Sequence, residues 1–202
     1  MNVVYAIRAA QMDIAEVCVV LGPHVLRGTR VKKVDQSILQ TFDTPNFPPL
    51  ADFSVEVELH PWRTVRRKRT LVCRPTFQQN IITLTLHPGM SEQAVEHILQ
   101  ADPAGIIIRA YGPGMVPKSM FPWLKKATNK DIPVVFTSQT IRGRVDLHRY
   151  RKQLTLEELG VISAKDMTTE CTTVKLMWAL TQARNHRRLR ELMERNLVGE
   201  VE

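Results

Sequence analysis

Hydrophobic and polar positions follow two different patterns in the first part of this chain of 202 residues. Apolar residues recur at helical spacing over residues 3–10, and a continuous apolar run over residues 15–22 then ends in glycine. This pattern predicts a helix followed by a buried strand, because a strand covered on both faces has apolar residues throughout. Residues 53–60 instead alternate between apolar and polar side chains, which predicts a strand with one face in water.

From residue 81 onward the pattern changes to alternating strands and helices. Ser91 is expected to cap the first of these helices, and Pro122 must either lie in the first turn of the second helix or kink it. Such alternation implies a parallel sheet with helices on both faces. The predicted strands cover residues 81–89, 104–112 and 132–140, and the predicted helices cover 92–100, 118–130, 155–160, 168–183 and 186–199.

The net charge of +8 is concentrated in one short segment of the chain. Residues 1–60 carry five Lys and Arg side chains against seven Asp and Glu, whereas residues 61–75 carry six basic side chains and no acidic one. Trp62 within that segment is a candidate for stacking on a nucleic-acid base. We nevertheless interpret residues 61–77 as a basic connector between two domains, because isolated charges in such a segment more often keep a connector solvated. We therefore expect no nucleic-acid partner.

The cysteine spacing excludes several classes of protein. Cys18, Cys73 and Cys171 are far apart, odd in number and without a nearby histidine cluster. We therefore expect reduced thiols, no metal site and no cofactor. The N-terminus does not resemble a secretion signal, and the chain has no apolar run of about 18 residues, so neither secretion nor membrane insertion is predicted. These features favour a cytoplasmic protein.

Seven segments, in order and at compatible spacing, resemble the type I (cytoplasmic) L-asparaginase family. Much of the same pattern is similar to the D subunit of archaeal glutamyl-tRNA(Gln) amidotransferase. The segments are LRGTRVKKV (26–34), PNFPPLA (45–51), HPG (87–89), IIIRAYGPGMVP (106–117), IPVVFTSQTIRGRVD (132–146), GVISAKDMTTECTTVKLMWAL (160–180) and NLVGEVE (196–202).

The resemblance implies an α/β fold of two domains. Residues 1–60 are expected to be the last part of an N-terminal Rossmann-like α/β domain, so this domain is only partial in these 202 residues. Residues 78–202 are expected to be the complete, smaller C-terminal α/β domain with a parallel sheet. Because the chain starts within a predicted amphipathic helix, we expect an N-terminal portion to be missing.

The resemblance also implies hydrolysis of L-asparagine to L-aspartate and ammonia by a threonine nucleophile. Family members combine two catalytic threonines, in TGGTI-like and HGTDT-like segments, with a lysine in an RG-x-R-x-x-K loop. That loop is present here and makes Lys33 the expected catalytic lysine, whereas neither threonine segment is present. A threonine hydroxyl needs a base to remove its proton, and a lysine alone has nothing to activate. The chain by itself is therefore expected to be inactive.

Further residues receive expected roles from the resemblance. Tyr111 and Met115 would line the substrate site at a subunit interface, although Met115 stands where many members have asparagine and cannot replace its amide hydrogen bonds. Arg109, Thr137 and Thr140 would bind L-asparagine as an effector. The family assembly implied for this chain is a homodimer or homotetramer.

Two alternative functions remain open from the sequence. The first is the amidotransferase D subunit, which would pass ammonia towards a tRNA-linked ester together with a second subunit. The second is a non-catalytic module that binds an effector or dimerises through its C-terminal domain. An assay with asparagine, with and without a separately supplied N-terminal half, would distinguish these hypotheses.

Overall fold

The computed structural model describes residues 1–68, 70, 72–148 and 156–202. The chain forms two compact units, the first comprising Met1–Arg74 with Leu197–Glu200 and the second Pro75–Asn196 with Val201–Glu202. Within the described ranges, none of the helices combines the length and apolar character that crossing a membrane requires.

The described residues of the first unit form one helix and two small antiparallel sheets. The predicted order of helix and then strand is confirmed, but the prediction of a buried strand is wrong, because β1 lies at the edge of an antiparallel sheet and its four residues are only partly buried. The inner face of α1 packs Tyr5 and Ala9 against Val25 and Phe53 of the sheet. The larger sheet has the order β1-β2-β5-β6, and β3 pairs with β4 in a separate ladder. The elements are α1 (Asn2–Gln11), β1 (Cys18–Leu21), β2 (His24–Arg27), β3 (Lys32–Lys33), β4 (Phe42–Asp43), β5 (Ala51–Phe53) and β6 (Val57–Leu59).

The single strand predicted over residues 53–60 is wrong, because this region forms part of a hairpin. Strand β5 ends at Phe53 and β6 begins at Val57, and the two strands pair antiparallel. The backbone N–H and the hydroxyl of Ser54 both donate to the carbonyl oxygen of Glu56, at 3.2 and 2.6 Å, which reverses the chain direction. The alternation of apolar and polar side chains gave no signal for this turn.

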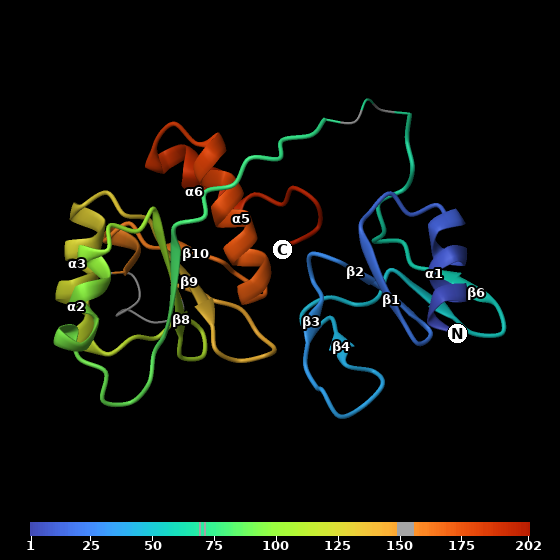
Figure 1. Cartoon of the computed structure of the whole chain (residues 1–202), viewed down its shortest axis with the longest axis horizontal. Helices are drawn as coiled ribbons and strands as arrows, with labels where there is room; N and C mark the ends of the chain where they lie inside the picture. The colour runs from blue at the N-terminus through green and yellow to red at the C-terminus, as the bar shows by residue number, and fades with distance from the viewer. Residues whose placement is uncertain (69, 71, 149–155) are drawn as a thin grey trace. The chain divides into compact units, whose positions relative to one another are not determined.

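The second unit confirms the predicted parallel sheet with helices on both faces. Its four strands have the order β10-β9-β8-β7 and are all parallel. Figure 1 shows α2 and α3 on one face of this sheet and α5 and α6 on the other. The elements are β7 (Ile81–Thr85), α2 (Glu92–Gln100), β8 (Gly105–Ala110), the 3-10 helix η1 (Lys118–Met120), α3 (Phe121–Asn129), β9 (Val134–Ser138), β10 (Ile162–Ser163), α5 (Thr169–Gln182) and α6 (His186–Glu194).

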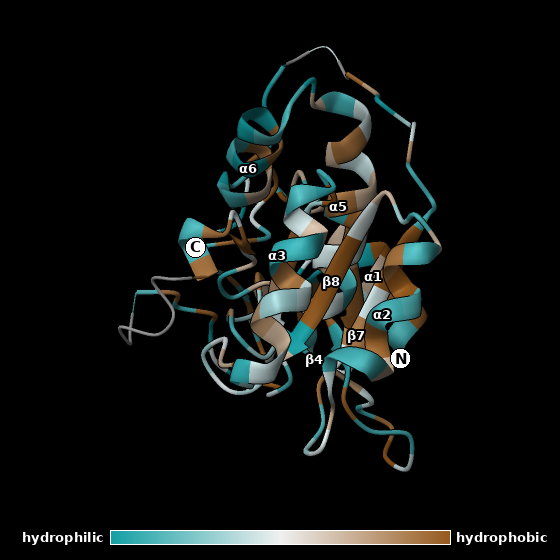
Figure 2. Cartoon of the chain, turned by 90° about the vertical axis from the view of Figure 1, so that its left-hand side faces the viewer, coloured by the Kyte–Doolittle hydropathy of each residue, from teal (hydrophilic) through white to brown (hydrophobic). Residues whose placement is uncertain are grey.

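The apolar run in β8 explains why both faces of this sheet are covered. Ile106 and Ile108 pack in the cluster beneath α2 and α3, whereas Ile107 packs in the cluster beneath α5 and α6. All three side chains are fully buried, and Figure 2 shows β8 in the colour of hydrophobic residues.

The predicted helix starts in this unit are also borne out, whereas the terminal helix predicted over 186–199 ends earlier, at Glu194. The Ser91 hydroxyl accepts a hydrogen bond from a backbone N–H in the first turn of α2, and Pro122 lies in the first turn of α3. Of the helix predicted at 155–160, residues 156–158 are helical, and residue 155 lies outside the described residues.

Candidate functional site

Lys33, the expected catalytic lysine, lies on the short strand β3. Its backbone is opposite Phe42 of β4, and the neighbouring Lys32 is opposite Asp43. The Lys33 side chain is exposed, whereas that of Lys32 is partly buried. Among the described residues, no hydrogen bond or ion pair involves the Lys33 side chain. The strand therefore presents the ammonium group of Lys33 to solvent.

The loop that leads to β3 is anchored by a buried ion pair between Arg27 and Glu16. The guanidinium of Arg27 contacts both carboxylate oxygens of Glu16, and both side chains are only 6% exposed. Burial alone would raise the pKa of the Glu16 carboxyl, but hydrogen bonds from Arg27 and from the backbone N–H of Thr64 outweigh it, so this pKa is lowered. The same surroundings raise the pKa of the nearby Cys18 thiol to about 11, chiefly through burial and then through the charge of Glu16.

The two N-terminal segments that carry the family resemblance contact each other directly. Phe47, from the PNFPPLA segment, places its ring 4.4 Å from the guanidinium carbon of Arg27 and 5.0 Å from that of Arg30. Such stacking of a guanidinium on an aromatic face is a cation–π contact. The edge of the Trp62 ring also meets Phe47, and the Trp62 indole N–H donates to the carbonyl oxygen of Pro49. These contacts hold the PNFPPLA segment against the basic loop.

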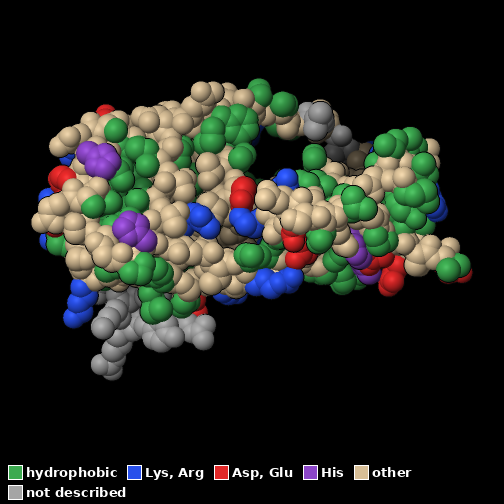
Figure 3. All heavy atoms as spheres, turned by 60° about the horizontal axis from the view of Figure 1, so that its bottom comes forward, with side chains coloured by type: hydrophobic (Ala, Val, Ile, Leu, Met, Phe, Trp, Pro, Cys, Tyr) green, Lys and Arg blue, Asp and Glu red, His purple; other side chains and the backbone are tan. Residues whose placement is uncertain are grey.

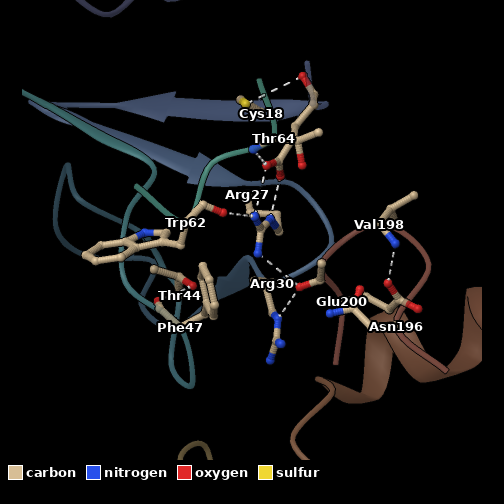
Figure 4. A network of polar contacts seen from close by, with 12 residues as sticks. Cys18, Arg27, Arg30, Thr44, Phe47, Trp62, Thr64, Asn196, Val198 and Glu200 are labelled. Atoms are coloured by element: carbon tan, nitrogen blue, oxygen red, sulfur yellow. Dashed lines mark hydrogen bonds and ion pairs between the residues drawn. The ribbon is translucent and has the colours of Figure 1, made fainter. Parts of the chain in front are cut away.

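Residues near the C-terminus also hold Arg27 and Arg30 in place. Arg30 Nε and Arg27 Nη1 both donate to the carbonyl oxygen of Gly199, at 2.7 and 3.2 Å. Figure 4 shows this network of contacts around Arg27 and Arg30. The buried carboxylate of Glu200 in turn accepts from the backbone N–H groups of Leu197 and Val198, which folds these last residues into a compact turn. Arg27 is therefore held by Glu16, Phe47 and Gly199, and Arg30 is held by Phe47 and Gly199.

Residues 62–66 of the basic segment 62–69 contact other parts of the first unit, while residue 69 lies outside the described residues. The Trp62 ring stacks on His60 at 4.8 Å. Arg63 donates to the carbonyl oxygen of Asp13, and Arg66 donates to two carbonyl oxygens at the end of α1. One basic side chain of the expected connector, Arg66, thus caps the C-terminus of α1.

In the second unit, the structure brings two of the expected effector residues together at the carboxyl ends of neighbouring strands. Thr85, Arg109 and Thr137 are adjacent in the registers of β7, β8 and β9. Arg109 Nη1 lies 3.4 Å from the hydroxyl of Thr85, and the hydroxyls of Thr137 and Thr169 are 3.0 Å apart. The buried Arg109 Nε has no hydrogen-bond partner within the described part of the chain. This edge of a parallel sheet is where ligands commonly bind.

The remaining expected residues lie in the loops beyond these strands. Tyr111 and Met115 face each other across a short bridge, and Met115 is 46% exposed. The Tyr111 hydroxyl is buried and, within the described residues, has no hydrogen-bond partner. The Thr140 hydroxyl is not directed at Arg109, because it pairs with the Ser138 hydroxyl at 2.7 Å and donates to the carbonyl oxygen of Arg142.

Two residues that shape these sites were not predicted from the sequence. The side-chain amide of Gln139 donates to the carbonyl oxygens of Leu86 and Arg109, which ties the turn after β9 to the residue after β7 and to the end of β8. Glu16 holds the lysine loop from a position next to an apolar strand. A lone acidic residue at the start of an apolar run is a signal for a buried ion pair, and it could have identified Glu16. Gln139 lies in a polar turn and carries no such signal.

No group of His, Cys, Asp and Glu side chains suited to a metal ion occurs within residues 1–68, 70, 72–148 and 156–202. Burial alone would raise the pKa of the Asp52 carboxyl, but hydrogen bonds from His60 and His24, at 2.8 and 2.6 Å, outweigh it and lower this pKa. We interpret this cluster as a structural contact between β2, β5 and the end of β6.

Two family models match most of the chain. The model of the glutaminase/asparaginase C-terminal domain matches residues 80–193, and the model of the asparaginase N-terminal domain matches residues 1–64. Both matches fall on the corresponding structural units.

Individual relatives are about one-third identical to this chain. L-asparaginase of Thermococcus kodakarensis is 33% identical over 99% of the chain, and the D subunit of the glutamyl-tRNA(Gln) amidotransferase of Methanobrevibacter smithii is 32% identical over 99% of it. The structure of the Thermococcus enzyme superimposes over the whole chain with a TM-score of 0.92. However, the chain spans only 61% of the length of that L-asparaginase and 48% of that of the amidotransferase protein.

Proposed function

Because the chain belongs to the asparaginase family, we propose that it supplies the lysine-bearing part of an L-asparaginase-type amidohydrolase site. The reaction is hydrolysis of the side-chain amide of L-asparagine to L-aspartate and ammonia, in the cytoplasm. The observation that carries this proposal is the anchored loop around Arg27 and Arg30, which leads directly to the exposed Lys33. The buried contacts of Arg27 and Arg30 support a role of this loop in positioning Lys33, because a merely solvated basic loop needs no such contacts.

Within this proposal, Lys33 acts on a proton and not as a nucleophile. A lysine can accept the proton of a threonine hydroxyl when its own proton is relayed or its basicity is tuned by neighbouring groups. The TGGTI-like and HGTDT-like segments that would supply the threonine do not occur in these 202 residues. We therefore propose that another polypeptide segment contributes the nucleophile, and that the chain is inactive alone.

The proposed effector site is the strand edge around Arg109 in the second unit. Its guanidinium lies next to the Thr85 and Thr137 positions, and its buried Nε is free to donate within the described structure. A guanidinium with flanking hydroxyls suits the α-carboxylate of L-asparagine. Tyr111 and Met115 are proposed to contribute to a substrate site in a homodimer or homotetramer.

A measurement of ammonia release from L-asparagine tests the main proposal. The purified chain should be inactive alone and become active when co-expressed with the segment of the Thermococcus L-asparaginase that has no counterpart here. Lys33→Ala should then lower the rate by about a hundredfold or more, as expected for loss of a general base. Lys32→Ala is the matched control and should keep the rate. Activity of the chain alone, or equal rates for the two variants, would contradict the proposal.

The similarity to the D subunits of glutamyl-tRNA(Gln) amidotransferases supports a second candidate function. In this case the ammonia would be delivered to glutamyl-tRNA(Gln) by a partner protein. The complemented chain would then release more ammonia in the presence of that partner and its tRNA substrate than with asparagine alone, and a rate independent of both would favour the L-asparaginase function.

A further inference from the structure

The first unit has a hollow of about 700 Å³ beside the start of β1. It is lined by residues just before β1, by the end of β2, by the basic segment of residues 62–69 and by Leu197 and Val198. Hydrogen bonds fix these walls, since the backbone N–H of Ala15 donates to the carbonyl oxygen of Thr64 at 2.7 Å. Figure 4 shows Thr64 and Val198 among the residues around it. Sites for small molecules commonly have volumes of about 300–1,000 Å³, so the hollow is large enough to hold one.

One part of the wall of this hollow is aliphatic. Ile14, Val17, Leu197 and Val198 line it, and the side chains of Val17 and Val198 are 85% and 59% exposed. None of the described residues that line the hollow is aromatic. A ligand with an aliphatic body would therefore remove exposed valine surface from water, which is favourable.

The other part of the wall is polar and carries an excess of positive charge. Arg27, Arg66 and Arg67 line it together with one described acidic residue, Glu16. Glu16 is bound through both carboxylate oxygens by Arg27, so the charges of these two residues compensate each other. Arg66 donates to carbonyl oxygens at the end of α1, whereas no hydrogen bond or ion pair among the described residues involves the Arg67 side chain. The Arg67 guanidinium is therefore available to pair with an anion.

Thr29 adds a second polar group that has no partner. Its hydroxyl oxygen is buried and forms no hydrogen bond within the described part of the chain, and Thr29 lines the hollow. Folded proteins rarely leave a buried hydroxyl unsatisfied, so this group points to a bound molecule. Elsewhere on this unit charged groups satisfy one another. Figure 3 shows histidine and acidic side chains together on its surface, where His24 and His60 bind the two carboxylate oxygens of Asp52.

We propose that this hollow binds a small organic anion with an aliphatic body, such as a medium-chain carboxylic acid. The carboxylate pairs with Arg67 and accepts a hydrogen bond from the Thr29 hydroxyl, and the aliphatic chain covers Val17 and Val198. This combination of an apolar wall with a few polar groups is typical of sites for small molecules.

The hollow shares residues with the loop that leads to Lys33. Arg27 and Thr29 line it and both belong to the RG-x-R-x-x-K pattern, so an occupant contacts this loop directly. The hollow is a different site from the strand edge around Arg109, which belongs to the second unit. Binding in the hollow needs no nucleophile and no turnover, so this inference stands or falls independently of the proposed function.

Calorimetric titration of the 202-residue chain with three probes tests the class of ligand. Octanoate should bind saturably with one molecule per chain. Acetate lacks the aliphatic chain and octylamine has the opposite charge, so both should bind at least about tenfold more weakly. If octylamine binds as well as octanoate, the hollow selects no anion and the proposal is overturned. If acetate binds as well as octanoate, the aliphatic part of the proposal is wrong.

Substitution of the polar wall tests where octanoate binds. Arg67→Gln should lower the affinity by about tenfold or more, because it removes the charge that pairs with the carboxylate. Thr29→Val keeps the shape of the side chain without its hydroxyl and should also weaken binding. The matched control is Lys68→Gln, since Lys68 is the next basic residue and does not line the hollow. Equal affinities of Arg67→Gln and Lys68→Gln would refute the site.

A second pair of variants distinguishes the hollow from other apolar surface. Val17→Glu places a negative charge in the aliphatic wall and should lower the affinity for octanoate by about tenfold or more. Ile7→Glu is the matched control, because Ile7 is also exposed, at 57%, and lies on α1 outside the hollow. Equal circular dichroism spectra and melting temperatures will show that both variants fold. Weakening by Ile7→Glu and not by Val17→Glu would place octanoate on α1 and overturn the proposal.

Nuclear magnetic resonance of the wild-type chain provides a readout of the contact with the lysine loop. Saturation with octanoate should shift the backbone amide signals of residues 27–33, and acetate at the same concentration should leave them unchanged. Binding that shifts none of these signals would show that the ligand does not contact the loop, and the site would lie elsewhere.

Discussion

Gly199→Ala tests whether the last residues of the chain hold the lysine loop. Gly199 has a backbone φ of +85°, where any other residue is strained. A Cβ at this position would lie 2.4 Å from the guanidinium carbon of Arg27 and 2.5 Å from its Nη1. Arg27 cannot easily move aside, because Glu16 holds its guanidinium through two contacts. The substitution should therefore displace Gly199 and its neighbours from both arginines.

The cost of this displacement has two parts. An alanine in the left-handed region costs about 1–2 kcal/mol, and the loss of a hydrogen bond from a charged donor costs about 1.5–3 kcal/mol. Arg30 and Arg27 would both lose their acceptor on Gly199. Since movement of the chain end relieves most of the strain, the two lost hydrogen bonds dominate, and we expect the free energy of unfolding to fall by about 3–6 kcal/mol in total.

Urea unfolding of the wild type and two glycine variants provides the measurement. Gly22→Ala is the control, because Gly22 is in the same unit with a φ of +55° and has no atom within 4 Å of its built Cβ. This control should lose only about 1–2 kcal/mol, from backbone strain. Both variants should keep the m-value and lower the midpoint, with a larger shift for Gly199→Ala. Equal shifts would show that the contact with Arg27 contributes nothing and would refute the reasoning.

Two further predictions follow from the buried ion pair. Because burial and Glu16 raise the pKa of Cys18 to about 11, iodoacetamide at pH 8 should alkylate the exposed Cys73 well before Cys18, and comparable rates by mass spectrometry would contradict this environment. The pKa of Glu16 is lowered below its ordinary 4.5, so the pair stabilises the fold above that pH and the contribution is lost as the pH falls through the folded-state pKa. Glu16→Gln should therefore lower the free energy of unfolding at neutral pH and make it depend less on pH in the acid range. If urea unfolding shows the same loss of stability towards low pH for the variant and the wild type, this would argue against the pair with Arg27.

The sequence predicts the second unit well because its signals are local. The apolar run that includes Ile106, Ile107 and Ile108 needs cover on both faces, and this requirement alone implies helices on two sides of the sheet. Ser91 and Pro122 mark helix starts through contacts within a few residues. By contrast, β10 has only two residues, which is too short for any periodic pattern to reveal it.

The first unit was predicted less well because its structure depends on distant contacts. The turn after Phe53 is set by hydrogen bonds between Ser54 and Glu56, and no glycine or proline marks it. The RG-x-R-x-x-K pattern makes Lys33 the expected catalytic lysine, but the residues that anchor this loop cannot be identified from the pattern. Glu16 lies 11 residues from Arg27, and Gly199 lies 172 residues from it. No pattern within a window of the sequence connects such positions.

This distribution of anchors has a consequence for how Lys33 is held. Arg27 and Arg30 of the RG-x-R part of the motif are buried and contact Phe47 and Gly199. We therefore propose that they fix the backbone that leads to β3. A substitution at Gly199 should then disturb the presentation of Lys33 although it lies far away in the chain, and a complemented Gly199→Ala chain should hydrolyse asparagine more slowly than the wild type.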